Sequence, residues 1–153
     1  MTYYVGIDPG LKGGIAILTA STISPGKPPE LVAWLKMPAA GGEANVEGPF
    51  SVSRDWHPAL HLVRNFIRFN APRYAAGKPI LAIEQVNGIR GQSASASFNF
   101  GLAVGLLIEG LRYVCAWDKC YSFSKMRWGP RAGLKVRATK KDSVLRALEL
   151  FPD

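Results

Sequence analysis

The sequence predicts a single mixed α/β domain, in which helices flank a five-stranded sheet of three antiparallel and then two parallel strands. Two observations support this prediction. The N-terminal part contains three short apolar runs separated by turn-forming residues, whereas helical and strand patterns alternate in the remainder. This order is typical of one mixed sheet with helices on its faces. The 153 residues suffice for one core and show no linker or internal repeat.

The three N-terminal strands are predicted from apolar runs and the turns between them. Residues 2–8 and 14–19 are apolar runs on either side of a Pro-Gly turn, which is typical of a β-hairpin. Residues 31–35 form a third run after the proline-rich segment 20–29, which we expect to be a loop. Residues 38–54, rich in Gly, Ala and Pro, are expected to form a long, mobile loop.

The remainder alternates helices and strands. Leu60, Val63 and Ile67 form a helical stripe. Thr139 and Asp142 are spaced as in a capping box, so Asp142 is expected to be structural and to mark the start of the last helix. The apolar face of that helix is expected to carry Val144, Leu145, Leu148 and Phe151. The predicted elements are a helix over 58–70, a strand over 80–84, a helix over 95–111, a strand over 113–117 and a helix from 139.

The chain has a formal net charge of +8, and its basic residues gather in one stretch. No acidic residue lies between Lys119 and Lys141. This excess favours a polyanionic partner, with a solvated basic loop as the alternative. Glycines and Pro130 predict a mobile connection that orders on nucleic acid, and Trp128 is a candidate for stacking on a base. The candidate phosphate-binding residues are Lys125, Arg127, Arg131, Lys135, Arg137, Lys140 and Lys141.

Two carboxylates, Asp8 and Glu84, end apolar runs in the same way. A single strand-end acid is commonly a turn or cap residue, but two at matching positions suggest a site. If their strands are parallel neighbours, both acids meet at the sheet edge where ligands bind. Adjacent carboxylates repel, and Mg²⁺ or Mn²⁺ removes that cost. Beside a basic surface, such a site suits phosphodiester hydrolysis, with Lys12 or Lys141 offsetting charge on the phosphate.

The cysteines and the lengths of the apolar runs indicate in which cellular compartment the protein works. Cys115 and Cys120 have the spacing of no common zinc site, and we expect them to be reduced thiols of a cytoplasmic or nucleoid-associated protein. No apolar run approaches the ~20 residues of a membrane span, and no basic leader precedes the first run. Neither a membrane anchor nor a signal peptide is therefore expected.

Several segments resemble the RuvC-type Holliday junction resolvases, members of the ribonuclease H-like superfamily. Gly6-Ile7-Asp8-Pro9-Gly10 with its Gly-rich hairpin, and Ala82-Ile83-Glu84-Gln85-Val86, look like the two leading motifs of that family. Residues 92–101 are similar to the Gly/Ser/Phe segment of its phage and organelle members. Residues 124–128 resemble, in altered form, their short Pro-x-x-Trp-Lys-like element.

The resemblance implies a ribonuclease H-like fold and a dimeric, Mg²⁺-dependent endonuclease that nicks four-way DNA junctions symmetrically. It implies that Asp8 and Glu84 are metal ligands, in a complete site that holds two Mg²⁺ or Mn²⁺ ions. Phe98 would act as a wedge between bases at the branch point, or else pack in the core or at a dimer interface. The serines would donate to phosphates or cap a helix. The residues implied to approach the junction are Gln92, Ser93, Ser95 and Phe98.

One departure from the family pattern limits this reading. The family completes its site with two further acids, or His plus Asp, on a helix that follows the one starting near Thr139. This sequence stops at Phe151-Pro152-Asp153, so we expect the domain over 1–153 to lack that final helix. Two alternatives therefore stay open. One is a non-catalytic junction binder with an incomplete metal site, and the other is a nucleotide-binding domain of the actin/sugar-kinase type, which needs a second such domain.

Overall fold

The computed structural model describes residues 2–9, 13–20, 29–37, 56–71, 78–85, 91, 93–135 and 137–152. Within these ranges the chain forms five strands and four helices. Their bounds are Thr2–Asp8 (β1), Gly14–Ala20 (β2), Glu30–Lys36 (β3), Trp56–Asn70 (α1), Ile80–Glu84 (β4), Ala94–Leu111 (α2), Ala116–Phe123 (β5), Lys125–Arg131 (α3) and Lys140–Leu150 (α4). Most of the predicted loop over 20–29, and all of that over 38–54, lie outside the described residues.

The strands form one sheet in the order β3-β2-β1-β4-β5. β1, β2 and β3 are antiparallel neighbours, whereas β4 is parallel to β1 and β5 is parallel to β4. The predicted mixed sheet of three antiparallel and then two parallel strands is therefore confirmed. The parallel register pairs Ile7 of β1 with Ile83 of β4, so both strands end together, one residue later.

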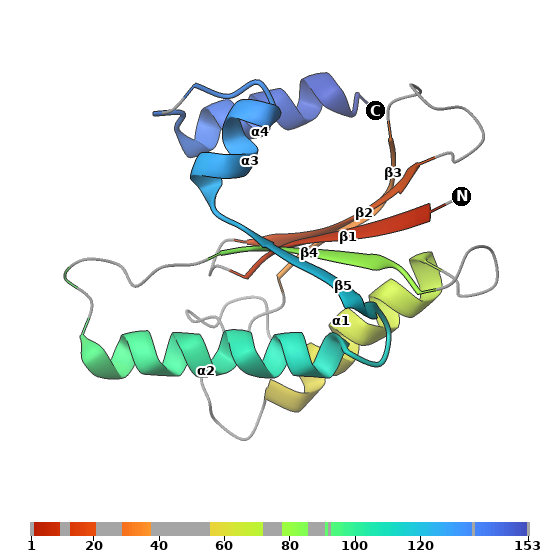
Figure 1. Ribbon diagram of the computed structural model, residues 1–153, viewed down its shortest axis with the longest axis vertical. Coiled ribbons are helices and arrows are strands. Elements are labelled where there is room, and N and C mark those ends of the chain that lie inside the picture. The colour runs from red at the N-terminus through yellow and green to blue at the C-terminus, as the bar shows by residue number, and fades with distance from the viewer. Residues whose placement is uncertain are drawn as a thin grey trace.

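Helices α1 and α2 cover one face of the sheet, and α3 and α4 lie over the other (Figure 1). Because side chains alternate along a strand, the buried branched aliphatic residues of the central strands reach the same face. There they pack into a core with Val63 and Ile67 of α1 and with Leu107 and Leu111 of α2. The strand residues of this core are Val5, Ile7, Ile15, Ile17, Leu81 and Ile83.

The fifth strand lies later in the chain than the sequence predicted. The fifth strand is present, but its expected bounds over 113–117 are wrong except at 116 and 117. The backbone N–H groups of Val114 and Cys115 donate to the Leu111 carbonyl at 3.0 and 2.9 Å and close the end of α2. Val114 and Cys115 are buried, so their apolar character reflects core packing in a turn. Both cysteines are free thiols, and burial raises the pKa of Cys115 to about 12.

The described part of the basic stretch is mostly regular structure, and the expected connection is reduced to the short segment between α3 and α4. The stretch begins within β5, continues through α3 and ends in the first turn of α4. Pro130 lies in the last turn of α3, and Gly133 adopts a φ of +83° in the turn that follows. Glycine and proline therefore serve a helix end and a tight turn here.

Helix α4 begins as predicted but does not bury its apolar side. The backbone N–H of Thr139 donates to the Asp142 carboxylate at 2.6 Å, and the Thr139 hydroxyl accepts from the Asp142 backbone N–H, which confirms the capping box. No residue of α4 is buried. Val144, Leu145 and Leu148 of the predicted apolar face stay between 50% and 54% exposed, and Val144 lines the cleft between α4 and the sheet.

Candidate metal and nucleic-acid site

Asp8 and Glu84 form an acidic pair at the carboxyl ends of adjacent parallel strands. β1 ends at Asp8 and β4 ends at Glu84, one residue beyond the paired Ile7 and Ile83. Both acids are partly buried, and both line the same cleft. The structure therefore brings together the two carboxylates that the sequence motifs singled out.

The surroundings of Glu84 disfavour its charged form. Desolvation by burial raises its pKa above the ordinary value, and the neighbouring Asp8 carboxylate raises it further. A hydrogen bond from Trp128 and the positive charges of Lys125 and Lys140 oppose this rise without cancelling it. A bound cation would relieve the repulsion between the two carboxylates, so the pair is suited to hold one.

The donor chemistry of the acidic pair fits a hard divalent cation. Within the described ranges, no third His, Cys, Asp or Glu joins the pair to make a larger metal-binding cluster. Mg²⁺ keeps several water ligands and is usually held by one or two carboxylates, so two oxygen donors at a partly exposed edge match its needs. They do not match the nitrogen and sulfur donors typical of structural zinc.

The acidic pair faces a cleft of about 670 Å³ between the sheet and the two C-terminal helices. Small residues of the sheet line it, on the face opposite the core, because Gly6, Ala16 and Ala82 alternate with buried neighbours. Trp34 of β3, which is 71% exposed, lines it from the edge of the sheet. From the helices, the cleft is lined by Trp128, Lys140, Val144 and Ala147. The cleft is thus mainly apolar, with the acidic pair and one lysine as its charged groups.

Helix α3 stands directly beside the acidic pair because β5 delivers it there. The backbone N–H of Gln85 donates to the Phe123 carbonyl at 2.8 Å, which fixes the end of β4 against the end of β5. Ser124 is the N-cap of α3, and the backbone N–H of Trp128 donates to the Ser124 carbonyl at 3.2 Å. Trp128 therefore lies one helical turn from the strand end, in the wall of the cleft that Glu84 also lines, and as a hydrogen-bond donor its indole lowers the pKa of that acid.

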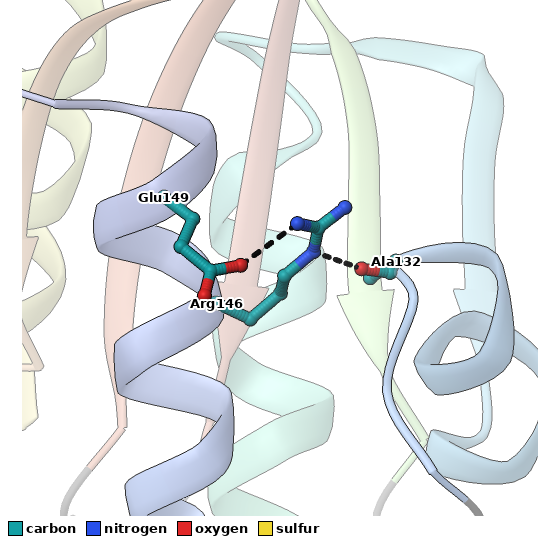
Figure 2. Close-up of polar contacts among 3 residues, drawn as sticks. All are labelled: Ala132, Arg146 and Glu149. Atoms are coloured by element: carbon teal, nitrogen blue, oxygen red, sulfur yellow. Dashed lines mark hydrogen bonds and ion pairs between the residues drawn. The ribbon is translucent and has the colours of Figure 1, made fainter.

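Helices α3 and α4 and their connecting turn are joined into one element, which we call the α3–α4 unit. Figure 2 shows Arg146 of α4 bridging the two helices: its Nε donates to the Ala132 carbonyl at 2.7 Å, and its Nη1 pairs with Glu149 at 2.8 Å. Lys125 Nζ donates to the Ala138 carbonyl at 3.2 Å. These bonds join the two helices into one strongly basic element, which lies over the sheet.

The predicted phosphate-binding residues are all exposed on this unit. Lys125, Arg127 and Arg131 come from α3, and Lys135 and Arg137 from the connecting turn. Lys140 and Lys141 come from the first turn of α4. The structure brings Lys125 and Lys140 within electrostatic reach of Glu84, and Lys140 also lines the cleft. The predicted residues Lys12 and Gln92 lie outside the described residues.

The other predicted DNA-contacting residues lie at the N-terminal end of α2, away from the cleft lining. Ser93 and Ser95 are exposed, and the backbone N–H of Ser97 donates to the Ser93 carbonyl at 3.0 Å. Phe98 is 69% exposed, so the alternative in which it packs in the core is wrong. Its exposure leaves the wedge and the dimer interface as its possible roles.

The contact between Trp128 and Glu84 was not predictable from a basic stretch taken as a loop. The signal that finds it is a helix start: Ser124, a residue type preferred at N-caps, precedes Lys125-Met126-Arg127-Trp128 directly after an apolar strand. With that helix in place, Trp128 falls one turn from the strand end and above the neighbouring strand.

No family model and no curated protein matches this sequence. Among solved structures, the chain is similar to T. thermophilus RuvC in complex with a Holliday junction substrate, with a TM-score of 0.62 and 15% sequence identity. The match covers 99% of this chain and 80% of that chain. At this identity the likeness shows the fold, so the predicted ribonuclease H-like architecture of the RuvC type is confirmed. In the described ranges, no helix is both long and apolar enough to cross a bilayer.

Proposed function

We propose that this protein is a structure-selective endonuclease that hydrolyses phosphodiester bonds in branched DNA, with the four-way junction as its substrate. The observation that carries the proposal is the acidic pair, Asp8 and Glu84, at two parallel strand ends beneath a basic helical unit. The RuvC-like fold and the junction bound by the T. thermophilus protein support this substrate class. The Gly/Ser/Phe segment supports a place beside the phage and organelle members of the family.

In this proposal, Asp8 and Glu84 hold Mg²⁺ or Mn²⁺, and the family resemblance implies two ions in the complete site. Asp8 and Glu84 would hold the cation, which would supply activation of the attacking water and charge stabilisation of the leaving oxygen. The residues of the chain supply position and charge. Lys140, which lines the cleft beside the pair, attracts the phosphate and offsets its negative charge, and Lys12 or Lys141 adds to this effect.

The basic α3–α4 unit would bind the DNA backbone through its exposed lysines and arginines. Phosphate contacts of this kind carry no base information, so selection would come from the shape of the branch point. Phe98, exposed near the start of α2, is placed to insert between bases there, and Ser93 and Ser95 are available to approach phosphates.

We also propose that the protein acts as a homodimer joined through α2, because symmetric nicking of a junction requires two active sites. The outer face of α2 is apolar and smooth, with Phe98 at 69% and Leu102 at 38% exposure. Gly101 lies between Phe98 and Leu102 on this face, and Gly105 lies one turn after Gly101. A Cβ at either glycine would meet no atom within 4 Å. Such a face suits close contact with the same helix of a second copy.

A second candidate function is junction binding without cleavage. It is favoured by one observation: among the described residues, the acidic pair is joined by no third metal-binding side chain. Two carboxylates suffice to hold one Mg²⁺, but they supply fewer ligands than two-metal hydrolysis commonly uses.

The test is to incubate the protein with a labelled four-way junction, and separately with linear duplex of the same sequence, in Mg²⁺. We expect binding and nicking of the junction, little action on the duplex, and loss of nicking with retained binding in Asp8→Asn. Tight junction binding without nicking by the native chain would establish the non-catalytic alternative. Equal affinity for the junction and the duplex would rule out structure selectivity.

A further inference from the structure

We propose that Trp128 is a positioning residue, whose indole N–H holds the Glu84 carboxylate in the orientation that metal binding requires. This inference rests on the proposed function, which makes Glu84 a metal ligand. It goes beyond that function because the proposed function gives Trp128 no part in the metal site.

The geometry starts from the two parallel strand ends. The bond from the Gln85 N–H to the Phe123 carbonyl locks the ends of β4 and β5 together, and α3 starts two residues after Phe123. Trp128 is half-buried in the wall of the cleft that Glu84 also lines. An indole has one N–H donor and no acceptor, so in its hydrogen bond with Glu84 the carboxylate accepts.

A neutral donor suits this place better than a cation would. A lysine bonded directly to the carboxylate would compete with the metal for its charge, whereas an indole N–H occupies one lone pair and leaves the net charge unchanged. Partners of this kind fix the direction in which a ligating carboxylate points, and losing one typically costs 10–100-fold in metal affinity. Hydrogen bonds from Arg146 and Lys125 hold the α3–α4 unit together, so the helix that carries Trp128 is fixed relative to α4.

The same contact gives Trp128 a role that needs no DNA. Stacking on a base, the role suggested by its place in a basic stretch, requires an aromatic face and no N–H. The two roles therefore respond differently when the ring is kept and the donor is removed. Met126, two residues earlier on α3 and 81% exposed, offers a matched control on the same helix.

The experiment compares Trp128→Phe with Met126→Ala in the full chain. Mn²⁺ affinity is measured by calorimetry, and the indole N–H resonances of the four tryptophans are recorded by ¹H–¹⁵N NMR. We expect Mn²⁺ to bind about 10–100-fold more weakly to Trp128→Phe and unchanged to Met126→Ala. The indole N–H resonance that is missing from the spectrum of Trp128→Phe belongs to Trp128. This resonance is expected to shift in the spectrum of Glu84→Gln. A second variant covers the case in which Trp128→Phe is poorly folded. It carries 3-benzothienylalanine at position 128, which replaces the N–H by sulfur but keeps the ring shape, and it should show the same loss of Mn²⁺ affinity.

The outcomes separate this inference from the proposed function. Weaker Mn²⁺ binding by Trp128→Phe, with no junction cleavage by any form, would leave the positioning role standing and reject the nuclease. Unchanged Mn²⁺ affinity in both position-128 variants would overturn the positioning role, whatever the nuclease does. Unchanged Mn²⁺ affinity, with junction binding weakened by the smaller ring of Trp128→Phe but not by 3-benzothienylalanine, would assign the indole ring of Trp128 to base stacking. Absence of Mn²⁺ binding by the native chain would reject both the metal site and the role of Trp128 in it.

Discussion

At the scale of single residues, the protein places Glu84 where partial burial and the neighbouring Asp8 carboxylate disfavour its charged form. Burial and Asp8 together raise the pKa of Glu84, which is the opposite of what a stabilising surface carboxylate shows. Such an arrangement costs folding stability unless a cation is bound. Acids with perturbed pKa values cluster at functional sites, and this is the physical reason for treating Asp8 and Glu84 as a functional site.

A pH-dependent stability effect follows from the raised pKa of Glu84. Because folding favours the protonated form, the contribution of Glu84 to stability is present at low pH and is lost as the pH rises through its raised pKa. In metal-free buffer, Glu84→Gln should therefore unfold at a higher temperature than the native chain at pH 8. The difference should shrink towards pH 4, as thermal unfolding with EDTA would record.

Glu30→Gln, at the exposed start of β3 and outside the cleft, is the matched control and should show no such gain. A Glu84→Gln variant that is less stable than the native chain at pH 8 would mean that the charged carboxylate is stabilised in the fold. That result would contradict the repulsion described for the pair.

The sequence was informative about residues that end a regular run and uninformative about residues whose partners come from far along the chain. Asp8 and Glu84 could be found because each closes an apolar strand, and parallel strands share their carboxyl edge. The partnership of Trp128 with Glu84 spans two intervening elements, α2 and β5, and depends on where α3 starts. The one local signal of that position is the N-cap residue Ser124, and in a stretch taken as a loop it does not predict a helix, so Trp128 was interpreted from its basic neighbours.

At the scale of elements, the α3–α4 unit determines the shape of the site. Its two helices meet through a turn in which Gly133 has a φ of +83°, and a Cβ there would lie 3.2 Å from the Arg146 guanidinium. The ion pair of Arg146 with Glu149 is largely exposed and adds little stability by itself. The turn and the bond from Arg146 to the Ala132 carbonyl therefore matter more for holding α4 in place.

Replacing Gly133 tests this view of the turn. Gly133→Ala should destabilise the unit by about 1–2 kcal/mol, because an L-residue is strained at positive φ, and Arg146 must also move aside. Gly129→Ala is the matched control, since a Cβ at that helical position would meet Leu134 at an ordinary 3.9 Å. Hydrogen exchange of the α4 amides, together with urea unfolding, measures the effect.

Faster α4 exchange in Gly133→Ala and not in Gly129→Ala is the expected pattern. Equal exchange in the two variants would show that the left-handed turn does not hold α4 in place.

The elements themselves show where sequence patterns are reliable. Strands β1, β2 and β4 and helices α1 and α2 follow their apolar patterns closely, because each buries one face in the core. Strand β3 also forms where its apolar run predicts, although none of its residues is buried. The run from Tyr113 to Trp117 misled the prediction, since Val114 and Cys115 are apolar for packing in a turn. The capping box of Thr139 was predictable because it is local, whereas the exposure of Val144 was not, since burial depends on what lies opposite.

At the scale of the whole molecule, one face of the sheet provides stability and the other face carries the candidate site. The sheet face under α1 and α2 holds the aliphatic core, and the face under the α3–α4 unit keeps small residues and an open cleft (Figure 1). The ligand edge lies at the carboxyl ends of the parallel strands, as in other sheets of this kind. The net charge of +8 adds long-range attraction for a polyanion.

The proposed α2 interface can be tested without disturbing the monomer. Gly105→Arg adds bulk and charge where a Cβ has open space, so it should leave the fold intact and weaken dimerisation. Leu62→Arg, at a 51% exposed position of α1, is the control with the same added charge. Sedimentation equilibrium should show a dimer for the native chain and for Leu62→Arg, and a monomer for Gly105→Arg. A native chain that stays monomeric in the presence of junction DNA would contradict the dimer.

The most direct test of the acidic pair as a nuclease site is the single-turnover rate of junction nicking in Mg²⁺, compared between the native chain and Asp8→Asn. Removing a carboxylate that holds the metal should lower the rate by about 100-fold or more, because metal stabilisation of the transition state is worth several kcal/mol. Junction affinity should be unchanged or higher, since Asp8→Asn also removes a negative charge. Equal nicking rates for the two proteins would contradict the role of Asp8 and Glu84 as the catalytic metal site.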